Sequence, residues 1–189
     1  MRVFIAAEIP EKIKDYLEKI QNELKCLAIR ASWVKRQNHY LTLIFFYEIN
    51  PKQAKSAAEI LKEKNAGKTI IELKTSDLGA FPSLDSPRTL WVGLTGNLDE
   101  LQIINQNLRE KLASQKIPFD PKPFVPHLTL GRLRKMKTWQ RKKISRILKQ
   151  FLLKEKPKFR IKQISLIKSQ LTSQGPIYQN LEKISLVWQ

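Results

Sequence analysis

The chain has 189 residues, 42% of them hydrophobic, and a single cysteine, so it can bury a core but cannot form an internal disulfide. Its 35 basic and 17 acidic residues give a net charge of +18, which favours a polyanionic partner, nucleic acid before membrane. No apolar run approaches the roughly 20 residues of a membrane span, the N-terminus is too soon interrupted for a signal peptide, and the lone cysteine suggests a reducing compartment, so a cytoplasmic protein is expected.

The first half of the chain predicts alternating strands and helices. Pro10 is a typical first residue of a helix, and an apolar stripe at helical spacing follows it as far as Leu24. The expected elements, in order, are a strand at 2–9, this helix, a strand at 38–48, a helix at 50–65 ended by Ala66–Gly67, and a strand at 69–78.

The second half repeats the theme. After a loop, a strand leads through Gly96–Asn97 into an amphipathic helix, and Thr138 is expected to cap a basic helix. The expected elements are a loop at 79–87, a strand at 89–94, a helix to about 112, a strand around 127–130, the basic helix from 138 to about 153, and strands at 158–168 and 177–187. No long linker interrupts this order, so 1–189 is expected to form one domain.

Several common sites are not found in the sequence. There is no glycine-rich phosphate loop of the G-x-x-x-x-G-K-[ST] or G-x-G-x-x-G type. There is also no C-x-x-C pair, no H-E-x-x-H, and no other His or Cys cluster at metal spacing. A nucleoside-triphosphate enzyme or a zinc enzyme is therefore not expected, and neither is a cofactor.

One of the two histidines lies in a segment that suits an anion. In the run from Phe124 to Arg132, leucines alternate with His127 and Thr129, which predicts a strand with these two side chains on one face, about 7 Å apart. Arg132 follows at the expected end of the strand. An imidazole, a hydroxyl and a guanidinium on one short element suit a phosphate.

A second segment repeats this pattern. Tyr40-Leu41-Thr42-Leu43 matches His127-Leu128-Thr129-Leu130 at three of four positions, in the same spacing. Two ordinary Leu/Thr-rich strands would also explain so short a repeat. The alternative is a duplicated phosphate-binding strand, in which Thr42 and Thr129 have the same task.

Taken together, these and further segments resemble the 2H phosphoesterase superfamily, and within it the RNA 2′,3′-cyclic phosphodiesterases, historically called 2′-5′ RNA ligases. The resemblance covers nearly the whole chain, in family order and spacing. The segments that carry it are 2–10, Trp33-Val34, 41–48, Gly79-Ala80-Phe81-Pro82, Arg88 with Trp91-Val92-Gly93, 124–132, Ser169-x-Leu171 and Gly175-Pro176-Ile177-Tyr178.

The resemblance implies an α+β fold of two similar α/β lobes with antiparallel sheets, related by a pseudo-twofold axis and flanking a central groove. It implies a metal-free reaction on RNA with a 2′,3′-cyclic phosphate end, which leaves a terminal 2′-phosphate. One motif histidine would protonate the leaving ribose oxygen, and His127 would deprotonate water. Thr42, Thr129 and Arg132 would hold the phosphate, and a monomer is expected.

The sequence departs from the family at the proton donor, where Tyr40 occupies the position of the first histidine and His39 lies one residue earlier. Three interpretations remain open. Tyr40 can donate the proton itself, because a phenol with a pKa near 10 is protonated at neutral pH. A bulge at residues 38–40 can turn His39 inward. Alternatively the donor is lost, and the protein binds RNA ends with little turnover. His39 as a solvated strand-edge residue is the default expectation.

Other side chains have more than one interpretation. Phe81, Trp91, Phe124 and Tyr178 are more often core residues than surfaces on which bases stack, although Tyr178 is also expected near the groove. The basic helix from 138 is either a solvated face or a patch that follows RNA away from the groove. The leading prediction is a phosphodiesterase acting on RNA ends, and the alternative is a non-catalytic RNA-end-binding protein of the same fold.

Overall fold

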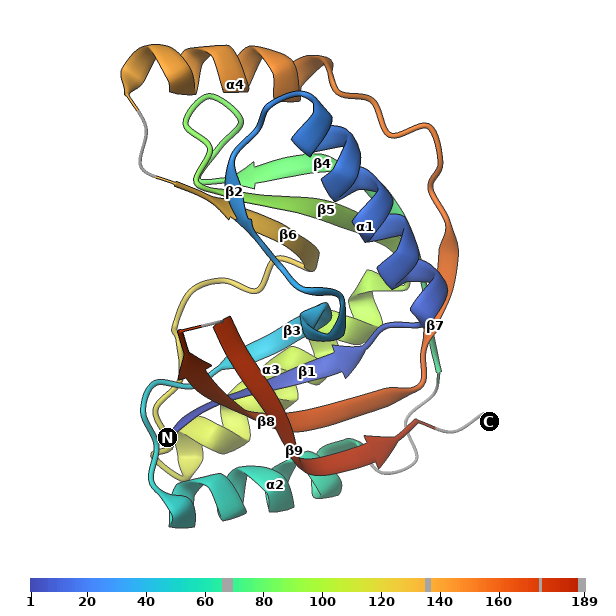
Figure 1. The fold of residues 1–189 in the computed structure, drawn as a ribbon. Coiled ribbons are helices and arrows are strands. Elements are labelled where there is room, and N and C mark those ends of the chain that lie inside the picture. The colour runs from blue at the N-terminus through green and yellow to red at the C-terminus, as the bar shows by residue number, and fades with distance from the viewer. Residues whose placement is uncertain (66–69, 135–136, 174, 187–189) are drawn as a thin grey trace.

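The computed structural model, which describes residues 1–65, 70–134, 137–173 and 175–186, contains two antiparallel sheets that lie one above the other in a C-shaped outline (Figure 1). The first sheet has the strand order β3 (Tyr40–Phe45), β1 (Arg2–Glu8), β8 (Gln163–Thr172), β9 (Gly175–Ser185). The second has the order β2 (Ala31–Trp33), β6 (His127–Leu133), β5 (Thr89–Gly96), β4 (Ile71–Phe81), β7 (Lys158–Ile161). The α+β fold with two antiparallel sheets is confirmed.

Helices cover one face of each sheet. The helices are α1 (Glu11–Cys26), α2 (Pro51–Asn65), α3 (Leu98–Ser114) and α4 (Thr138–Gln150), with a short 3-10 helix η1 (Arg36–Asn38) before β3. Helices α2 and α3 pack against each other and on the first sheet, whereas α1 and α4 lie over the second (Figure 1). The other face, which carries Tyr40 and Thr42 in the first sheet and His127, Thr129 and Arg132 in the second, is called the groove face below.

The core joins both sheets in one cluster of buried apolar side chains. On β1, Val3, Ile5 and Ala7 are buried in this cluster together with Leu90 and Leu128 of the second sheet. The alternate residues of β1 are buried as well, because they are covered on the groove face by a smaller cluster. That cluster consists of Phe4, Ala6 and Ile167, with Tyr40 and Tyr178 packed against it. The N-terminal strand is therefore enclosed on both sides.

Three predicted element boundaries are wrong for local reasons. The strand at 38–48 begins only at Tyr40, because the backbone N–H of His39 closes η1 by bonding to the Arg36 carbonyl. The loop at 79–87 begins after Phe81, since residues 79–81 still pair with β5. Helix α4 ends at Gln150, and its cap is Lys137, whose N–H donates to Gln140 Oε1 at 2.8 Å, rather than Thr138.

The largest error concerns the predicted strand at 158–168. It is two strands, β7 and β8, separated by Lys162 alone and belonging to different sheets. Tyr178 lies within β9, in agreement with the strand predicted from residue 177. The predicted helix end at Ala66–Gly67 and the C-terminal residues of the last strand, 187 onward, lie outside the described residues.

Matching bulges in β3 and β6 relate the two sheets. In the β1–β3 pair the register passes from Ile5↔Ile44 to Ala6↔Thr42, so that Leu43 is the extra residue. In the β5–β6 pair it passes from Leu90↔Gly131 to Trp91↔Thr129, so that Leu130 is extra. Each bulge therefore falls on the second leucine of a Leu-Thr-Leu segment. The repeat seen in the sequence is also a repeat of backbone geometry.

Candidate active site

The bulge at Leu130 brings three side chains of β6 to one face. His127 and Thr129 share a face by alternation, while Leu128 and Leu130 are fully buried on the other. Without the bulge, the Arg132 side chain would lie on the same face of the strand as Leu128 and Leu130. Because one residue is inserted, Arg132 instead pairs with Thr89, on the same side as Trp91 and Thr129. The predicted trio of His127, Thr129 and Arg132 thus projects into the groove.

The His127 ring is held by one hydrogen bond and two aromatic rings. Its Nδ1 lies 2.6 Å from the Val125 carbonyl, so Nδ1–H is the donor and Nε2 is the nitrogen left for a substrate. The Phe81 ring lies edge-on at 4.9 Å and the Trp91 ring at 5.9 Å, measured between centroids. Burial, helped by the Arg132 charge, lowers the pKa of His127 below its usual 6.5. A neutral imidazole at pH 7 suits a general base.

Glycines make room for the Trp91 indole on this face. The indole lies so close to Gly79 of β4 that a Cβ there would come within 2.2 Å of the ring. Gly93, which pairs directly with His127, is also closely approached, by Ser76 and the indole. Phe81 and Trp91, interpreted as core residues, are thus half-buried rings of the groove face that pack around the imidazole.

The first sheet presents Tyr40 and Thr42 in the equivalent places. Both are half-buried, and the bulge at Leu43 lies directly after Thr42. The Tyr40 ring lies 6.2 Å from that of Phe4 and 5.9 Å from that of Tyr178. Burial raises the pKa of Tyr40, and the charges of Glu8 and Tyr178 act in the same direction. The phenol is therefore protonated at neutral pH.

Two further residues are neighbours of Tyr40. Tyr178 was expected near the groove, and Glu8 was not singled out from the sequence. Glu8 is the direct register partner of Tyr40, and its Oε1 accepts a hydrogen bond from Ser165 at 3.2 Å and pairs with Lys183 at 3.0 Å. The Tyr178 ring packs on Phe4 at 5.0 Å. A pocket of about 320 Å³ opens beside Tyr40 and Tyr178.

Two observations link the groove faces across the gap. Strands β3 and β6 contact each other, although they belong to different sheets. Burial raises the pKa of Tyr178, and the Arg132 guanidinium opposes this shift, while the same charge acts on His127. Arg132 of the second sheet is thus electrostatically coupled both to its neighbour His127 and to a residue of the first sheet.

His39 has an unexpected environment. The expectation of a solvated residue is wrong, since the side chain is only 2% exposed, and the bulge of β3 lies at Leu43 rather than at 38–40. Its Nε2 lies 3.5 Å from Gln21 Nε2, and its Nδ1 is buried without a hydrogen-bond partner among the described residues. Gln21 also donates to the Leu130 carbonyl at 2.8 Å. His39 lies behind the strands, where it supports β6.

Burial lowers the pKa of His39 to about 4, although the polar backbone of Thr129 raises the same pKa by a smaller amount. The unfolded chain therefore binds a proton at pH 5 that the folded chain does not, and we expect stability to fall as the pH drops from about 6.5 to about 4. Relative to His39→Gln, wild type should lose roughly 3 kcal/mol of unfolding free energy over this range, measured by urea unfolding. Parallel pH curves for the two proteins would contradict this assignment.

A family model described as LigT like Phosphoesterase matches this chain twice, over residues 7–91 and 92–178. The chain belongs to the LigT-like phosphoesterase family. Each match contains one of the two related strands, since Tyr40 and Thr42 fall in the first and His127 and Thr129 in the second. The two similar strands therefore fall in separate matches to the family model.

Similar proteins agree with this family assignment along the whole chain. The RNA 2′,3′-cyclic phosphodiesterase of Aquifex aeolicus is 32% identical over 187 residues, which cover 98% of this chain and 97% of that protein. The protein of the same name from Methanocaldococcus jannaschii is 32% identical over 185 residues, covering 97% and 99%.

Two solved structures of other proteins have the same fold. TT0787 of Thermus thermophilus superimposes with a TM-score of 0.78 at 22% identity, covering 98% of both chains. The E. coli LigT complex with 3′-AMP gives 0.74 at 20% identity, covering 98% of this chain and 97% of that one. At these identities the likeness concerns the arrangement of sheets and helices.

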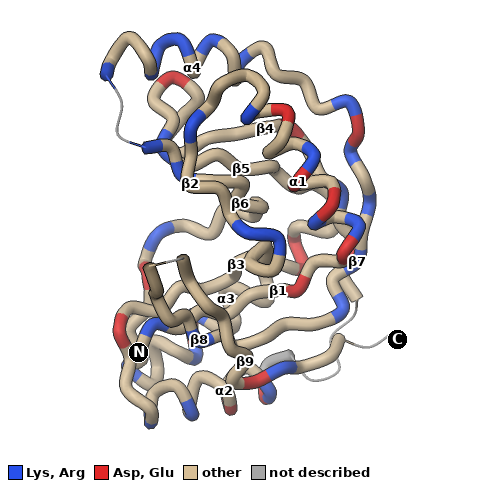
Figure 2. Tube along the Cα trace, viewed as in Figure 1, with Lys and Arg blue, Asp and Glu red and all other residues tan. Residues whose placement is uncertain are grey.

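Lys and Arg residues are spread along much of this LigT-like chain (Figure 2). They are dense on α4, which lies over the second sheet and away from the first (Figures 1 and 2). Within the described ranges, no three His, Cys, Asp or Glu side chains gather as a metal site requires. No helix in the described part of the chain is long and apolar enough to cross a bilayer.

Proposed function

We propose that this protein hydrolyses the 2′,3′-cyclic phosphodiester at an RNA end and leaves a 2′-phosphomonoester. The observation that carries the proposal is the pair of bulged strands, one from each sheet, that present a titratable side chain and a threonine on the groove faces. Membership in a phosphoesterase family and relatives named RNA 2′,3′-cyclic phosphodiesterase support it. The net charge of +18 suits an RNA substrate.

The reaction we propose uses His127 and Tyr40 as a base and an acid. Neutral His127 takes a proton from water through Nε2, and the hydroxide oxygen forms a bond to phosphorus. The bond from phosphorus to the ribose 3′ oxygen breaks, and that oxygen receives the phenolic proton of Tyr40. Thr42, Thr129 and Arg132 hold the phosphoryl oxygens while negative charge develops on them. No metal ion or cofactor takes part.

The function is tested with a short RNA that ends in a 2′,3′-cyclic phosphate. We expect turnover in the presence of EDTA and a product with a 2′-phosphate, identified by its mass and by its resistance to an enzyme that removes only 3′-phosphates. Phosphorus NMR of a hydrolysed cyclic mononucleotide provides an independent check. A 3′-phosphate product, or activity that disappears with EDTA, would contradict the mechanism.

A non-catalytic RNA-end-binding protein is the second candidate, and Tyr40 in the donor position is the observation that favours it. A phenol with a raised pKa is a weaker acid than an imidazolium. This candidate predicts tight binding of cyclic-phosphate ends, measured by fluorescence anisotropy, with no more hydrolysis than in buffer. Turnover of wild type that depends on His127 would exclude it.

We also infer that residues 1–189 act as one two-lobed domain, as a monomer in the cytoplasm. One core cluster that includes both sheets supports the single domain, and the free, exposed thiol of Cys26 suits a reducing compartment. Light scattering should give a mass near 22.1 kDa. A mass near twice this value would contradict the monomer.

A further inference from the structure

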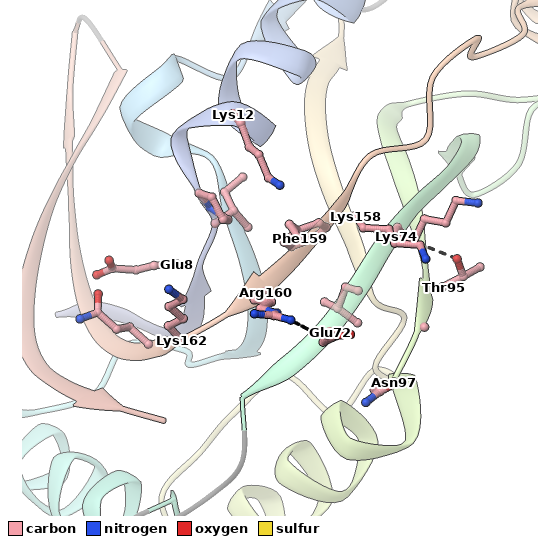
Figure 3. Close-up of a pocket in the computed structure, with 15 residues that line it drawn as sticks. Glu8, Lys12, Glu72, Lys74, Thr95, Asn97, Lys158, Phe159, Arg160 and Lys162 are labelled. Carbon is pink, nitrogen blue, oxygen red and sulfur yellow. Dashed lines mark hydrogen bonds and ion pairs between the residues drawn. The ribbon is translucent and has the colours of Figure 1, made fainter. Parts of the chain in front are cut away.

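A pocket of about 880 Å³ lies where the two sheets converge near the β7–β8 junction (Figure 3). Its lining comes from the end of β1, the start of α1, and strands β4, β5, β7 and β8. Residues that the reaction does not use form most of this surface. Their chemistry is basic, since five cationic side chains line the pocket against two carboxylates: Lys12, Lys74, Lys158, Arg160 and Lys162 against Glu8 and Glu72.

Strand register shows that this pocket continues both groove faces. In the second sheet His127 pairs with Gly93, and two residues along β5 on the same face lies Thr95, which lines the pocket and pairs with Lys74. In the first sheet Tyr40 pairs with Glu8, which also lines the pocket. Because opposed residues of antiparallel strands point to one side, the pocket begins next to both proposed catalytic positions.

The basic side chains stand in a row along the edge strand β7. Lys158 and Arg160 flank buried Phe159, so these two cations share one face of β7 about 7 Å apart, and Lys162 follows directly after the strand. This interval is of the same order as the spacing of phosphates along an extended nucleic-acid strand. Arg160 pairs with Glu72 at 2.6 Å, as Figure 3 shows.

Lys74 and Lys158 are directly opposed across β4 and β7. Like charges in opposed positions destabilise a sheet, and within the described residues neither amine has a carboxylate partner. Lys12 reaches toward the same space from α1 (Figure 3). An anion bound between these side chains would relieve their repulsion.

Protection of an edge strand explains only part of this arrangement. Lysines on an exposed edge discourage pairing with another sheet, which accounts for Lys158 on β7 and for Lys162 directly after it. Lys74 lies on β4, an inner strand with neighbours on both sides, and Lys12 lies on a helix. Neither residue protects an edge, yet both line the same pocket.

We propose that this pocket holds the backbone phosphates of the nucleotides that precede the cyclic end of the RNA. The inference rests on the proposed function, because a cyclic phosphate held between Tyr40 and His127 leaves the rest of the strand to exit through a neighbouring part of the groove. Lys74 and Lys158 take the first of these phosphates, and Lys162 and Lys12 extend the path. The contacts are electrostatic and independent of base sequence.

The test compares Lys74→Gln/Lys158→Gln with Lys52→Gln/Lys55→Gln, a control that removes the same charge from exposed positions on α2. The substrates are a 2′,3′-cyclic mononucleotide and a hexanucleotide with the same cyclic end. For the pocket variant we expect KM for the hexanucleotide to rise about tenfold, with a salt dependence shallower by roughly 1 to 2 in log–log slope. In the pocket variant, KM for the mononucleotide should stay as in wild type. In the control variant, KM for both substrates should stay as in wild type.

The outcomes separate this inference from the proposed function. If wild type hydrolyses both substrates and the pocket variant binds the hexanucleotide as well as the control does, the pocket is not the RNA path. If KM for the mononucleotide rises in the pocket variant by the same factor as KM for the hexanucleotide, the two lysines act on the reaction and do not bind the RNA strand. If wild type hydrolyses neither substrate, the proposed function fails, and equilibrium binding of the hexanucleotide to the same two variants still decides the path.

Discussion

Replacing His127 by alanine should lower kcat for cyclic-phosphate hydrolysis by about 10²- to 10⁴-fold, the usual cost of losing a general base. The ring faces the groove with its Nε2 unused, and burial keeps it neutral near pH 7. KM should change little, since Thr42, Thr129 and Arg132 remain to hold the phosphate. Steady-state kinetics with a cyclic mononucleotide measures both values.

The pH profile gives the same residue a second test. A base must be unprotonated, and the pKa of His127 lies below 6.5, so kcat/KM of wild type should fall only as the pH drops below this value. The acid limb should disappear from the residual activity of His127→Ala. A variant with wild-type kcat and an unchanged acid limb would remove His127 from the mechanism.

The second large effect is expected at Tyr40, where two substitutions should act in opposite directions. Tyr40→Phe removes the phenolic proton but keeps the ring against Phe4 and Tyr178, so kcat should fall by about 10²-fold. Tyr40→His provides an imidazolium, which gives up its proton more readily near pH 7, and kcat should rise above wild type. Single-turnover kinetics reports the chemical step for each variant.

Tyr178→Phe is the matched control for Tyr40→Phe, because it removes the other phenol of the same aromatic cluster. It should leave kcat within about threefold of wild type, as a phenol that only packs on Phe4 gives no proton to the substrate. If Tyr40→Phe retains full activity while Tyr40→His gains, the phenol contributes nothing and the donor site is vacant in the native protein.

The sequence predicted the helices and most of the strands because their periodicity is local, and it placed His127 and Thr129 on one face for the same reason, whereas the short strand β2 was missed. The bulges at Leu43 and Leu130 were not predicted, because strict alternation was assumed along each strand and one inserted residue reverses the faces of the residues that follow it. Arg132 was therefore named for its chemistry before its direction was known. The boundary between β7 and β8 was missed because Lys162 continues the strand pattern on either side.

His39 illustrates a different limit. It was expected as a solvated residue at a strand edge, but it is buried beside Gln21 of α1, and burial depends on what packs against a side chain. A signal was present in α1, where Gln21 interrupts the apolar stripe between Leu17 and Leu24. A polar residue in such a place needs a buried partner. The partner could not be found without the tertiary structure.

The position of β1 has a consequence for how the chain is made. The N-terminal strand lies between β3 and β8, and β8 is close to the other end of the sequence. During synthesis the first strand therefore emerges long before its second neighbour, and pairing across so large a separation is slow. Until the last strands leave the ribosome, one edge of β1 stays open to other chains. A transcript cut short before β8 should yield an aggregating product rather than half an enzyme.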